Sequence, residues 1–541
     1  MVCMDKHIVL VLSAFLSVHA LLLFPNVVHG DTITSCSQTP YPETCNSFVS
    51  STIQPQANLD ETLFVFRESA LRVTMAQSEQ AHSLVSAMDL SSFNERAKAA
   101  WGDCLELYED TICQLNRSIG YDHSLGAIVD AQTWLSAAIT NHQTCQNGFI
   151  DFNLSSHLEA FPVMLSNFSK LLSNSLAINN AATLSSSSLL SKKQTKSRRL
   201  LADDDFPEWV STADRKLLEL SGAAPRADIV VAKDGSGNYK TISEAVVASV
   251  KLRSGTKRFV IYVKKGVYKE NVEIKESMKN LMFIGDGIDA TIVTGSKNVQ
   301  DGSTTFKSAT FAVSGDGFIA RDMTFENTAG PQKHQAVALR SGSDLSVFYS
   351  CSFKGYQDTL YVHSQRQYYR NCDIYGTIDF IFGDAVTVLQ NCNIYVRKPM
   401  SHQRNTITAQ GRSDPNENTG IVIHNSRVTA STDLRPVLSS IKTYLGRPWK
   451  KYSRTVFLKC CLDGLIDPAG WLPWSGSFAL RTLFYGEYMN TGDGAGTGGR
   501  VRWPGYKVIN SVTEAEKFTV GKFLDGDSWI SGTGVVFTSG L

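Results

Sequence analysis

Three cysteines recur at a nearly constant step in the second half of this 541-residue chain. Cys351, Cys372 and Cys392 lie 21 and 20 residues apart, and each is followed two positions later by Phe or Ile. A step near 20 residues suits one coil of a parallel β-helix, in which successive coils stack about 4.8 Å apart. From residue 227 onward, short runs rich in Val, Ile and Phe are separated by Gly and Asn, as expected for strands. A sandwich or a propeller would also contain many short strands, but the repeat favours the parallel β-helix.

Stacked coils would make the equivalent residues of successive coils neighbours. Cys372 and Cys392 would then lie within disulfide range, which is about 4.4–6.8 Å between Cα atoms. The spacing alone is equally compatible with a disulfide and with a ladder of buried free thiols.

The first half of the chain differs, because its apolar residues recur in steps of three and four. These stripes comprise Trp101, Leu105, Tyr108, Ile112, Leu115 and Ile119; Leu125, Ile128, Leu135 and Ile139; and Met164, Phe168, Leu171 and Ile178. Such spacing predicts amphipathic helices, and short connections between them predict an all-α four-helix bundle. Cys36 with Cys45, and Cys104 with Cys145, are the natural disulfide pairs, although spacing does not fix their connectivity.

The N-terminus carries an apolar stretch over residues 8–24 behind a short head that contains Lys6. Its length and position predict a signal peptide over residues 1–30, with an uncleaved signal anchor as the alternative. No later apolar run approaches about 18 residues, so no membrane contact is expected once the signal is removed. Entry into the secretory pathway suits disulfides, and sequons at Asn116, Asn153 and Asn167 predict glycosylation.

Charge divides the chain into unlike segments, although its formal net charge is only +1. Residues 31–190 carry 6 basic and 16 acidic residues. A Ser-rich and then basic stretch over 184–218 lacks periodicity and predicts a linker. The tetrads 198–201 and 215–218, each two basic residues followed by Leu-Leu, are candidate processing sites. The predicted units are thus 1–30 (signal), 31–183 (helical), 184–218 (linker) and 219–541 (β-helical). The net charge near zero results from an acidic helical segment and basic segments whose charges cancel.

Two aspartates occupy the same phase of neighbouring predicted coils. Asp358 lies seven residues after Cys351, and Asp379 lies seven residues after Cys372. Two carboxylates about 5 Å apart repel by about 3 kcal/mol at an effective dielectric near 20, which raises one pKa by about two units. One would stay protonated beside an ionised partner, giving a proton donor next to a nucleophile or base. The alternative is a pair of exposed acids on a β face.

Amide and guanidinium side chains are expected around this pair. Gln357 precedes Asp358, and Gln335 lies about one long coil upstream, where an amide donor can stabilise an oxyanion. Arg447 offers a rigid fork that could hold Asp379 ionised and oriented.

The C-terminal part of the chain resembles the plant pectin methylesterases. The shared motifs are Gly266–Glu270 (GVYKE), Gln335–Arg340 (QAVALR), Tyr356–Tyr361 (YQDTLY), Gly376–Gly383 (GTIDFIFG) and Leu445–Trp449 (LGRPW). Residues 31–190 resemble the pectin methylesterase and invertase inhibitor domain that many such enzymes carry as a pro-region. Relative to its two expected bridges, Cys113 is an extra thiol.

The resemblance implies a two-domain protein, in which an all-α four-helix bundle precedes a right-handed parallel β-helix with an esterase cleft. It implies that Asp379 attacks the carboxymethyl ester of a galacturonate unit and that Asp358 protonates the departing methanol. Gln357 would stabilise the oxyanion, and Gln335, Arg447, Trp449 and Thr305 would contact substrate. It further implies a Cys372–Cys392 disulfide and leaves open the states of Cys113, Cys351, Cys460 and Cys461.

The resemblance also implies a secreted cell-wall enzyme without cofactor or metal. Its expected partners are pectin, a subtilisin-like processing protease and inhibitor proteins, with no nucleic acid. No Gly-x-Ser-x-Gly elbow, His-Glu-x-x-His site or phosphate loop is present in the sequence. A glycosidase or lyase acting on the same polymer is the closest alternative, since paired carboxylates also serve glycosidic cleavage. A non-catalytic wall-binding or inhibitor protein is the second.

Overall fold

The computed structural model describes residues 33–49, 59–120, 124–154, 162–193, 226–253 and 255–541. The predicted signal peptide and both basic tetrads lie outside these residues. Within the described ranges, no helix combines the length and apolar character that crossing a membrane requires.

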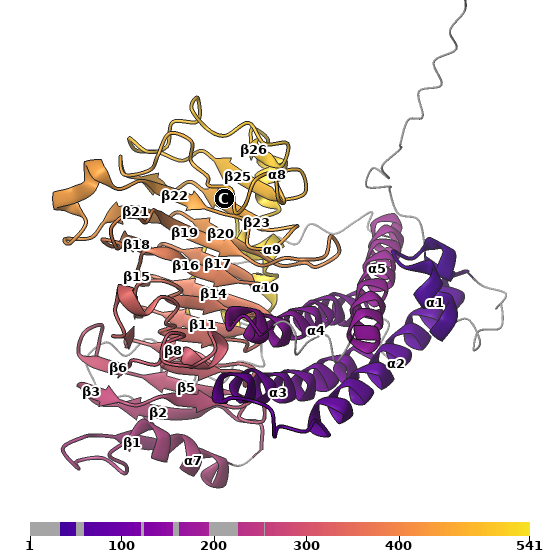
Figure 1. The fold of residues 1–541 in the computed structure, drawn as a ribbon, viewed down its shortest axis with the longest axis horizontal. Coiled ribbons are helices and arrows are strands. Elements are labelled where there is room, and N and C mark those ends of the chain that lie inside the picture. Colours follow the sequence, from indigo (N-terminus) through magenta and orange to yellow (C-terminus); the bar gives the residue numbers. More distant parts are fainter. Residues whose placement is uncertain (1–32, 50–58, 121–123, 155–161, 194–225, 254) are drawn as a thin grey trace, which may run out of the picture.

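The N-terminal half is helical, as predicted, and four long helices pack side by side (Figure 1). They share a core to which Leu107, Tyr108, Leu135 and Phe168 contribute. Side-chain oxygens of Asn94 and Ser124 cap the second and third of these helices by accepting hydrogen bonds from backbone amides. The helices of this half are α1 (Pro42–Phe48), α2 (Leu59–Ser86), α3 (Glu95–Ser118), α4 (Leu125–Asp151) and α5 (Pro162–Lys193), preceded by the short η1 (Cys36–Gln38).

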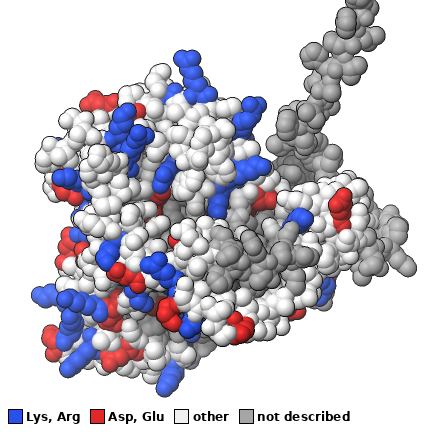
Figure 2. Space-filling view, viewed as in Figure 1, with Lys and Arg blue, Asp and Glu red and all other residues white. Residues whose placement is uncertain are grey.

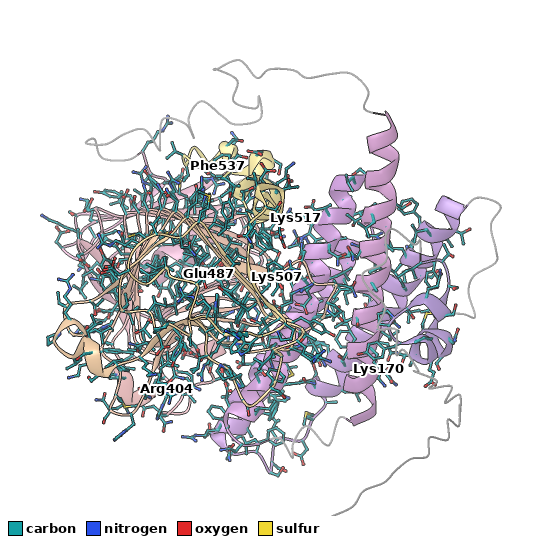
Figure 3. The ribbon with its side chains drawn as sticks, turned by 90° about the horizontal axis from the view of Figure 1, so that it is seen from above. Lys170, Arg404, Glu487, Lys507, Lys517 and Phe537 are labelled. Atoms are coloured by element: carbon teal, nitrogen blue, oxygen red, sulfur yellow. A yellow bond between two sulfur atoms is a disulfide. The ribbon has the colours of Figure 1, made fainter. Side chains whose placement is uncertain are left out.

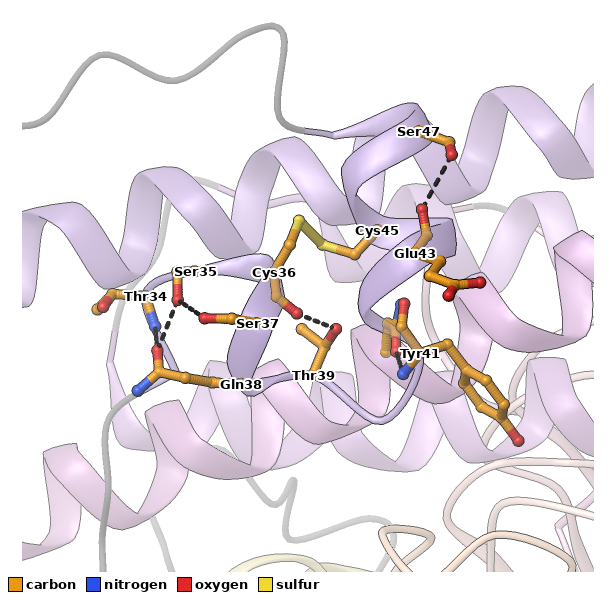
Figure 4. The surroundings of a disulfide bond; sticks show 11 residues. Thr34, Ser35, Cys36, Ser37, Gln38, Thr39, Tyr41, Glu43, Cys45 and Ser47 are labelled. Atoms are coloured by element: carbon orange, nitrogen blue, oxygen red, sulfur yellow. Dashed lines mark hydrogen bonds between the residues drawn. A yellow bond between two sulfur atoms is a disulfide. The ribbon is translucent and has the colours of Figure 1, made fainter.

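Both disulfides predicted in this half are present. Cys36 pairs with Cys45 across the turn between η1 and α1, where the Thr39 hydroxyl also donates to the Cys36 carbonyl at 2.8 Å (Figure 4). Cys104 pairs with Cys145 and so joins α3 to α4. Cys113 is a free thiol.

Two sequence predictions about the helices need correction. Of the predicted α3 stripe, Tyr108, Leu115 and Ile119 are buried, whereas Trp101, Leu105 and Ile112 are only partly buried. The buried face is broader than predicted and also includes the small side chains of Ala97 and Ala100. In addition, α5 continues to Lys193, into the predicted linker, because a serine-rich stretch without a Pro or Gly can extend an existing helix.

The C-terminal half is a parallel β-helix with three sheets (Figures 1 and 3). Sheet A contains β1 (Ile229–Val231), β2 (Phe259–Val263), β5 (Leu281–Ile284), β8 (Ile319–Arg321), β11 (Ser346–Tyr349), β14 (Arg366–Arg370), β17 (Val386–Gln390), β20 (Gly420–His424), β23 (Arg454–Leu458), β25 (Phe484–Tyr488) and β26 (Tyr506–Val508). Sheet B contains β3 (Gly266–Lys269), β6 (Thr291–Gly295), β9 (Thr324–Asn327), β12 (Ser352–Lys354), β15 (Asp373–Gly376), β18 (Asn393–Val396), β21 (Arg427–Ala430) and β24 (Cys461–Leu462). Sheet C contains β4 (Val272–Ile274), β7 (Phe311–Val313), β10 (Leu339–Ser341), β13 (Leu360–Val362), β16 (Ile378–Gly383), β19 (Asn405–Gln410) and β22 (Thr443–Gly446).

Each regular coil gives one strand to each sheet, so a strand pairs with the equivalent strand of the next coil. In sheet A, for example, Tyr368 on β14 is the register partner of Val388 on β17. The interior is apolar, and aromatic residues stack along it; Phe348 and Tyr369 lie 4.8 Å apart between ring centres. Helix α7 (Ile242–Leu252) lies at the N-terminal end, and α8 (Val512–Glu516), α9 (Val520–Phe523) and α10 (Gly526–Trp529) pack on the outside of sheet A.

The cysteine repeat forms the predicted ladder but not the disulfide. Cys351, Cys372 and Cys392 are buried free thiols, which corrects the prediction of a Cys372–Cys392 bond. The Cys372 thiol donates to the Phe348 carbonyl at 3.3 Å, so each coil provides an acceptor for the thiol of the next. The ladder continues upward through Ser426, whose hydroxyl accepts from the Cys392 amide, to Cys460.

The helical unit lies against one side of the β-helix, which Figure 3 shows from above. Several contacts from α4 are polar: Trp134 donates to Asp344, and Thr140 donates to Asp384 at 2.9 Å. The α4 residue Asp130 forms an ion pair with Arg366 at 2.6 Å. Figure 2 shows basic and acidic side chains interspersed over the visible face of the β-helix.

Candidate active site

A cavity of about 210 Å³ lies between the C-terminal part of α4 and the outer face of sheet C. The structure brings all seven predicted catalytic and substrate-binding residues together in its wall, namely Thr305, Gln335, Gln357, Asp358, Asp379, Arg447 and Trp449. Sequence reasoning did not identify the other residues of this wall, which include Tyr361, Phe382 and Trp474 from the β-helix and Thr144, Asn147 and Asp151 from α4.

The two aspartates lie in successive coils, as their spacing predicts. The amide of Asp358 donates to the carbonyl of Ile378 at 3.0 Å, next to Asp379. Both residues have left-handed backbone, with φ of 61° at Asp358 and 50° at Asp379. This conformation is uncommon for non-glycine residues and costs of order 1–3 kcal/mol when strained. The pairing of β16 with β19 also shifts register between Ile378 and Ile381, so the nucleophile candidate lies at an irregularity of the sheet.

Asp379 is held by two partners. Arg447 donates from Nε to Oδ1 at 2.8 Å and from Nη2 to Oδ2 at 2.5 Å. The Thr406 hydroxyl donates to Oδ1 at 2.6 Å and accepts from the backbone amide of Asp379 at 3.0 Å. This fork and hydroxyl stabilise an ionised carboxylate in one orientation. Thr406 was not predicted, because its role depends on the register of β19 against β16.

Asp358 lacks such support and is 8% exposed. Burial raises the pKa of Asp358 well above its usual range, and the nearby Asp379 and Asp151 carboxylates raise it further, against the opposing effect of Arg447. Burial therefore exceeds the charge repulsion on which the sequence prediction rested. A buried Asp358 with a raised pKa beside an arginine-paired Asp379 is an arrangement that can supply a proton donor and a nucleophile in one site.

The predicted amides and substrate contacts surround this pair. The amide of Ala336 donates to the carbonyl of Gln357 at 3.3 Å, which places Gln335 and Gln357 in adjacent coils. Trp449 lies edge-to-face with Phe382, with ring centres 5.9 Å apart. The hydroxyl of Thr305 donates to Asp151 on α4 at 2.9 Å, so a residue of the helical unit occupies this contact.

Ligand types for a metal are not clustered in the described part of the chain. No group of three or more His, Cys, Asp or Glu side chains there could hold a metal ion. The cavity wall includes carboxylates, amides, threonine hydroxyls, one guanidinium and aromatic rings, and its polar groups are suited to acid–base and nucleophilic chemistry.

Comparisons with known proteins agree with this geometry. The family model described as Pectinesterase matches residues 228–527, and the model described as Plant invertase/pectin methylesterase inhibitor matches residues 32–178. The chain is 57% identical over 531 residues to "Probable pectinesterase/pectinesterase inhibitor 6" of Arabidopsis thaliana, with 94% of each chain covered. It is 54% identical over 507 residues to "Pectinesterase 2" of Citrus sinensis, again with 94% of each covered.

A solved structure supports the same assignment. The "Pectin methylesterase from Carrot" is 60% identical, with a TM-score of 0.58, and the match covers 59% of this chain and 100% of that chain. The chain belongs to the pectinesterase family and carries a pectin methylesterase inhibitor domain ahead of its β-helix.

Proposed function

We propose that the β-helical unit hydrolyses the methyl esters of pectin through a covalent intermediate on Asp379. The observation that carries this proposal is the two-point support of Asp379 by Arg447 and Thr406 beside a buried Asp358 with a raised pKa. A carboxylate oxygen of Asp379 attacks the ester carbonyl carbon, and the tetrahedral oxyanion accepts hydrogen bonds from Gln357 and Gln335.

The same two aspartates complete the cycle. Collapse of the tetrahedral intermediate breaks the bond to methoxide, which takes the proton of Asp358 and leaves as methanol. Asp358 then removes a proton from water, which attacks the acyl intermediate and releases galacturonate and Asp379. Arg447 orients the Asp379 carboxylate for its attack through two hydrogen bonds and stays beside it in the acyl intermediate, and Trp449 offers a flat apolar face to a sugar ring.

Product analysis separates this function from cleavage of the polymer backbone. Highly esterified pectin treated with the β-helical unit should yield methanol and acid without new reducing ends. New reducing ends would instead indicate a glycosidase or lyase. Asp379→Ala should abolish methanol release. If the preparation of this variant released methanol at an unchanged rate, the activity would not depend on Asp379, and a binding or inhibitor protein without catalysis would be favoured.

The helical unit is proposed to block the cleft in an uncut precursor. Besides the Asp151–Thr305 contact, Asn147 of α4 accepts a hydrogen bond from Lys450 at 3.0 Å, and Thr144 contacts His363 Nε2 at 3.0 Å. Their α4 members, Thr144, Asn147 and Asp151, line the cavity where an ester would have to enter. A separate inhibitor protein with the same helical fold could bind the released β-helical unit in this way.

Processing is proposed to follow secretion to the cell wall, with a subtilisin-like protease cutting after one of the basic-Leu-Leu tetrads. Glycosylation is proposed at Asn116 and Asn153, which are exposed, and at Asn167, which is half-buried. The N-terminus of the secreted protein, measured by mass spectrometry, would identify the cleavage site. Methanol release at equal concentration should be much lower for the uncut chain, and equal rates would contradict blocking.

A further inference from the structure

Arg340 is a buried cation outside the catalytic group. It lies on β10, two strands from β16 in sheet C, or about 10 Å along the helix axis from the strand of the nucleophile. Its side chain is 2% exposed, and its Nε has no hydrogen-bond partner among the described residues. The guanidinium carbon lies 3.5 Å from the centre of the Phe306 ring, which fixes the plane of the fork.

The helical unit supplies the carboxylate closest to this cation. Glu106 on α3 places Oε1 3.9 Å from Arg340 Nη2, and its Oε2 accepts from Lys307 Nζ. Lys307 also pairs with Glu273 on β4 at 2.8 Å. The β-helix thus contributes two cations and one carboxylate here, and the helical unit contributes Glu106 together with Asp103, whose carboxyl also interacts electrostatically with both cations and has its pKa raised to about 7 by burial. Departure of α3 would leave one positive charge unpaired.

A second cavity, of about 410 Å³, lies between α3 and the β-helix at this position. Leu105 and Glu106 line it on one side, and Glu273 and Arg340 line it on the other. Phe306 lines both this cavity and the one that contains the catalytic pair. Release of the helical unit would therefore expose both cavities and join them into one continuous groove.

We propose that Lys307 and Arg340 form a carboxylate-binding subsite that takes an already demethylated galacturonate unit while Asp379 acts on a methyl ester further along the same polymer. Glu106 occupies this subsite in the precursor. A guanidinium binds a carboxylate through two charge-assisted hydrogen bonds, whereas a methyl ester presents no charge to it. The subsite rests on the esterase function, which methanol release from fully esterified pectin tests separately.

The β-helical unit can be studied alone. Its interior core cluster draws its buried residues from 229–485, with none from the helical unit. The carrot relative is a solved chain that is covered completely by 59% of this one.

The test compares kcat/KM of the β-helical unit on partly demethylated and on fully esterified pectin. Wild-type protein should prefer the partly demethylated polymer, and Arg340→Gln should lower that preference about tenfold, as expected for loss of a charge-assisted pair. Inhibition by a fully demethylated oligogalacturonide should weaken by a similar factor. Arg340→Lys should retain part of the preference.

Two further variants keep the test decisive. Arg427→Gln is the matched control, because Arg427 lies on sheet B and is 59% exposed, and it should leave the preference unchanged. If Arg340→Gln does not fold, Lys307→Gln tests the same subsite from a side chain that is 34% exposed. An unchanged preference and unchanged oligogalacturonide inhibition in the folded variants would overturn the proposal.

Discussion

At the scale of single residues, the site depends on where a backbone bends as much as on which side chains are present. Left-handed backbone at Asp379 directs the carboxylate outward from β16, and Thr406 holds that turn by contacting both its amide and its carboxylate. A valine at position 406 has nearly the same shape as threonine, so it would keep the fold of β19 but lose both contacts. Thr406 therefore positions Asp379, the proposed nucleophile.

Thr406→Val should lower kcat by roughly 10- to 100-fold, because a hydrogen bond to a charged group contributes about 1.5–3 kcal/mol. KM should change little, since Thr406 lies beneath Asp379 and is 1% exposed. Thr406→Ser retains the hydroxyl and should restore most of kcat. A drop in thermal stability with unchanged kcat would show that Thr406 has only a structural role.

At the scale of elements, each coil is fixed by its contact with the next. Gly383 ends β16 with φ of 128°, and a Cβ there would lie 2.0 Å from the Val362 carbonyl oxygen of the preceding coil. Only glycine allows this approach, which brings β13 and β16 together next to the catalytic aspartates.

Gly383→Ala should destabilise the β-helical unit by at least about 2 kcal/mol, through backbone strain and the clash. Gly498→Ala is the control, because nothing lies within 4 Å of the added Cβ. Thermal unfolding of both variants gives the comparison, with a decrease of about 5 °C or more expected for Gly383→Ala alone. Similar melting temperatures would contradict a tight approach at this position.

The strands, the coil repeat and the aspartate pair were predictable, because residues one repeat apart in the sequence become spatial neighbours when the coils stack. Asp358 and Asp379 share a phase, and the ordered coils bring them together. Thr406 and Trp474 could not be predicted, since they reach the cavity across strands and loops of irregular length. The Cys372–Cys392 bond was implied by the family resemblance and is not formed in this structure, whereas the spacing had left free thiols equally open because equal phase establishes proximity and not oxidation.

At the scale of the whole molecule, the interface between the two units buries ionisable groups of opposite pH response. Burial raises the pKa of Asp103 to about 7 and the pKa of Asp110 to about 6. Burial also lowers the pKa of His363 well below its usual range. A carboxyl group whose pKa is raised on docking stabilises the docked state at low pH, and this contribution is lost as the pH rises through the raised pKa. A histidine whose pKa is lowered on docking destabilises the docked state below about pH 6.5, where the free imidazole would be protonated.

Docking of the helical unit should therefore weaken from about pH 6.5 to pH 8, where Asp103 loses its proton and His363 is already neutral. With the linker cleaved, the raised pKa values of Asp103 and Asp110 predict roughly a four- to fivefold loss of affinity over this range. Inhibition of methanol release, measured against added helical unit at each pH, gives the affinity. Asp103→Asn should remove the decline, and an equally steep decline in that variant would exclude Asp103 as its cause.

The pairing of every strand with the strand one coil away has a consequence for the evolution of the groove. Each coil contacts its immediate neighbours, so a coil gained or lost at the N-terminal side of β7 would lengthen or shorten the groove by about 4.8 Å without moving Asp358 or Asp379. Reach along a polymer and the chemistry at one ester are separately adjustable in this architecture. Relatives could thus diverge in the number of sugar units they grip while their reacting centre stays the same.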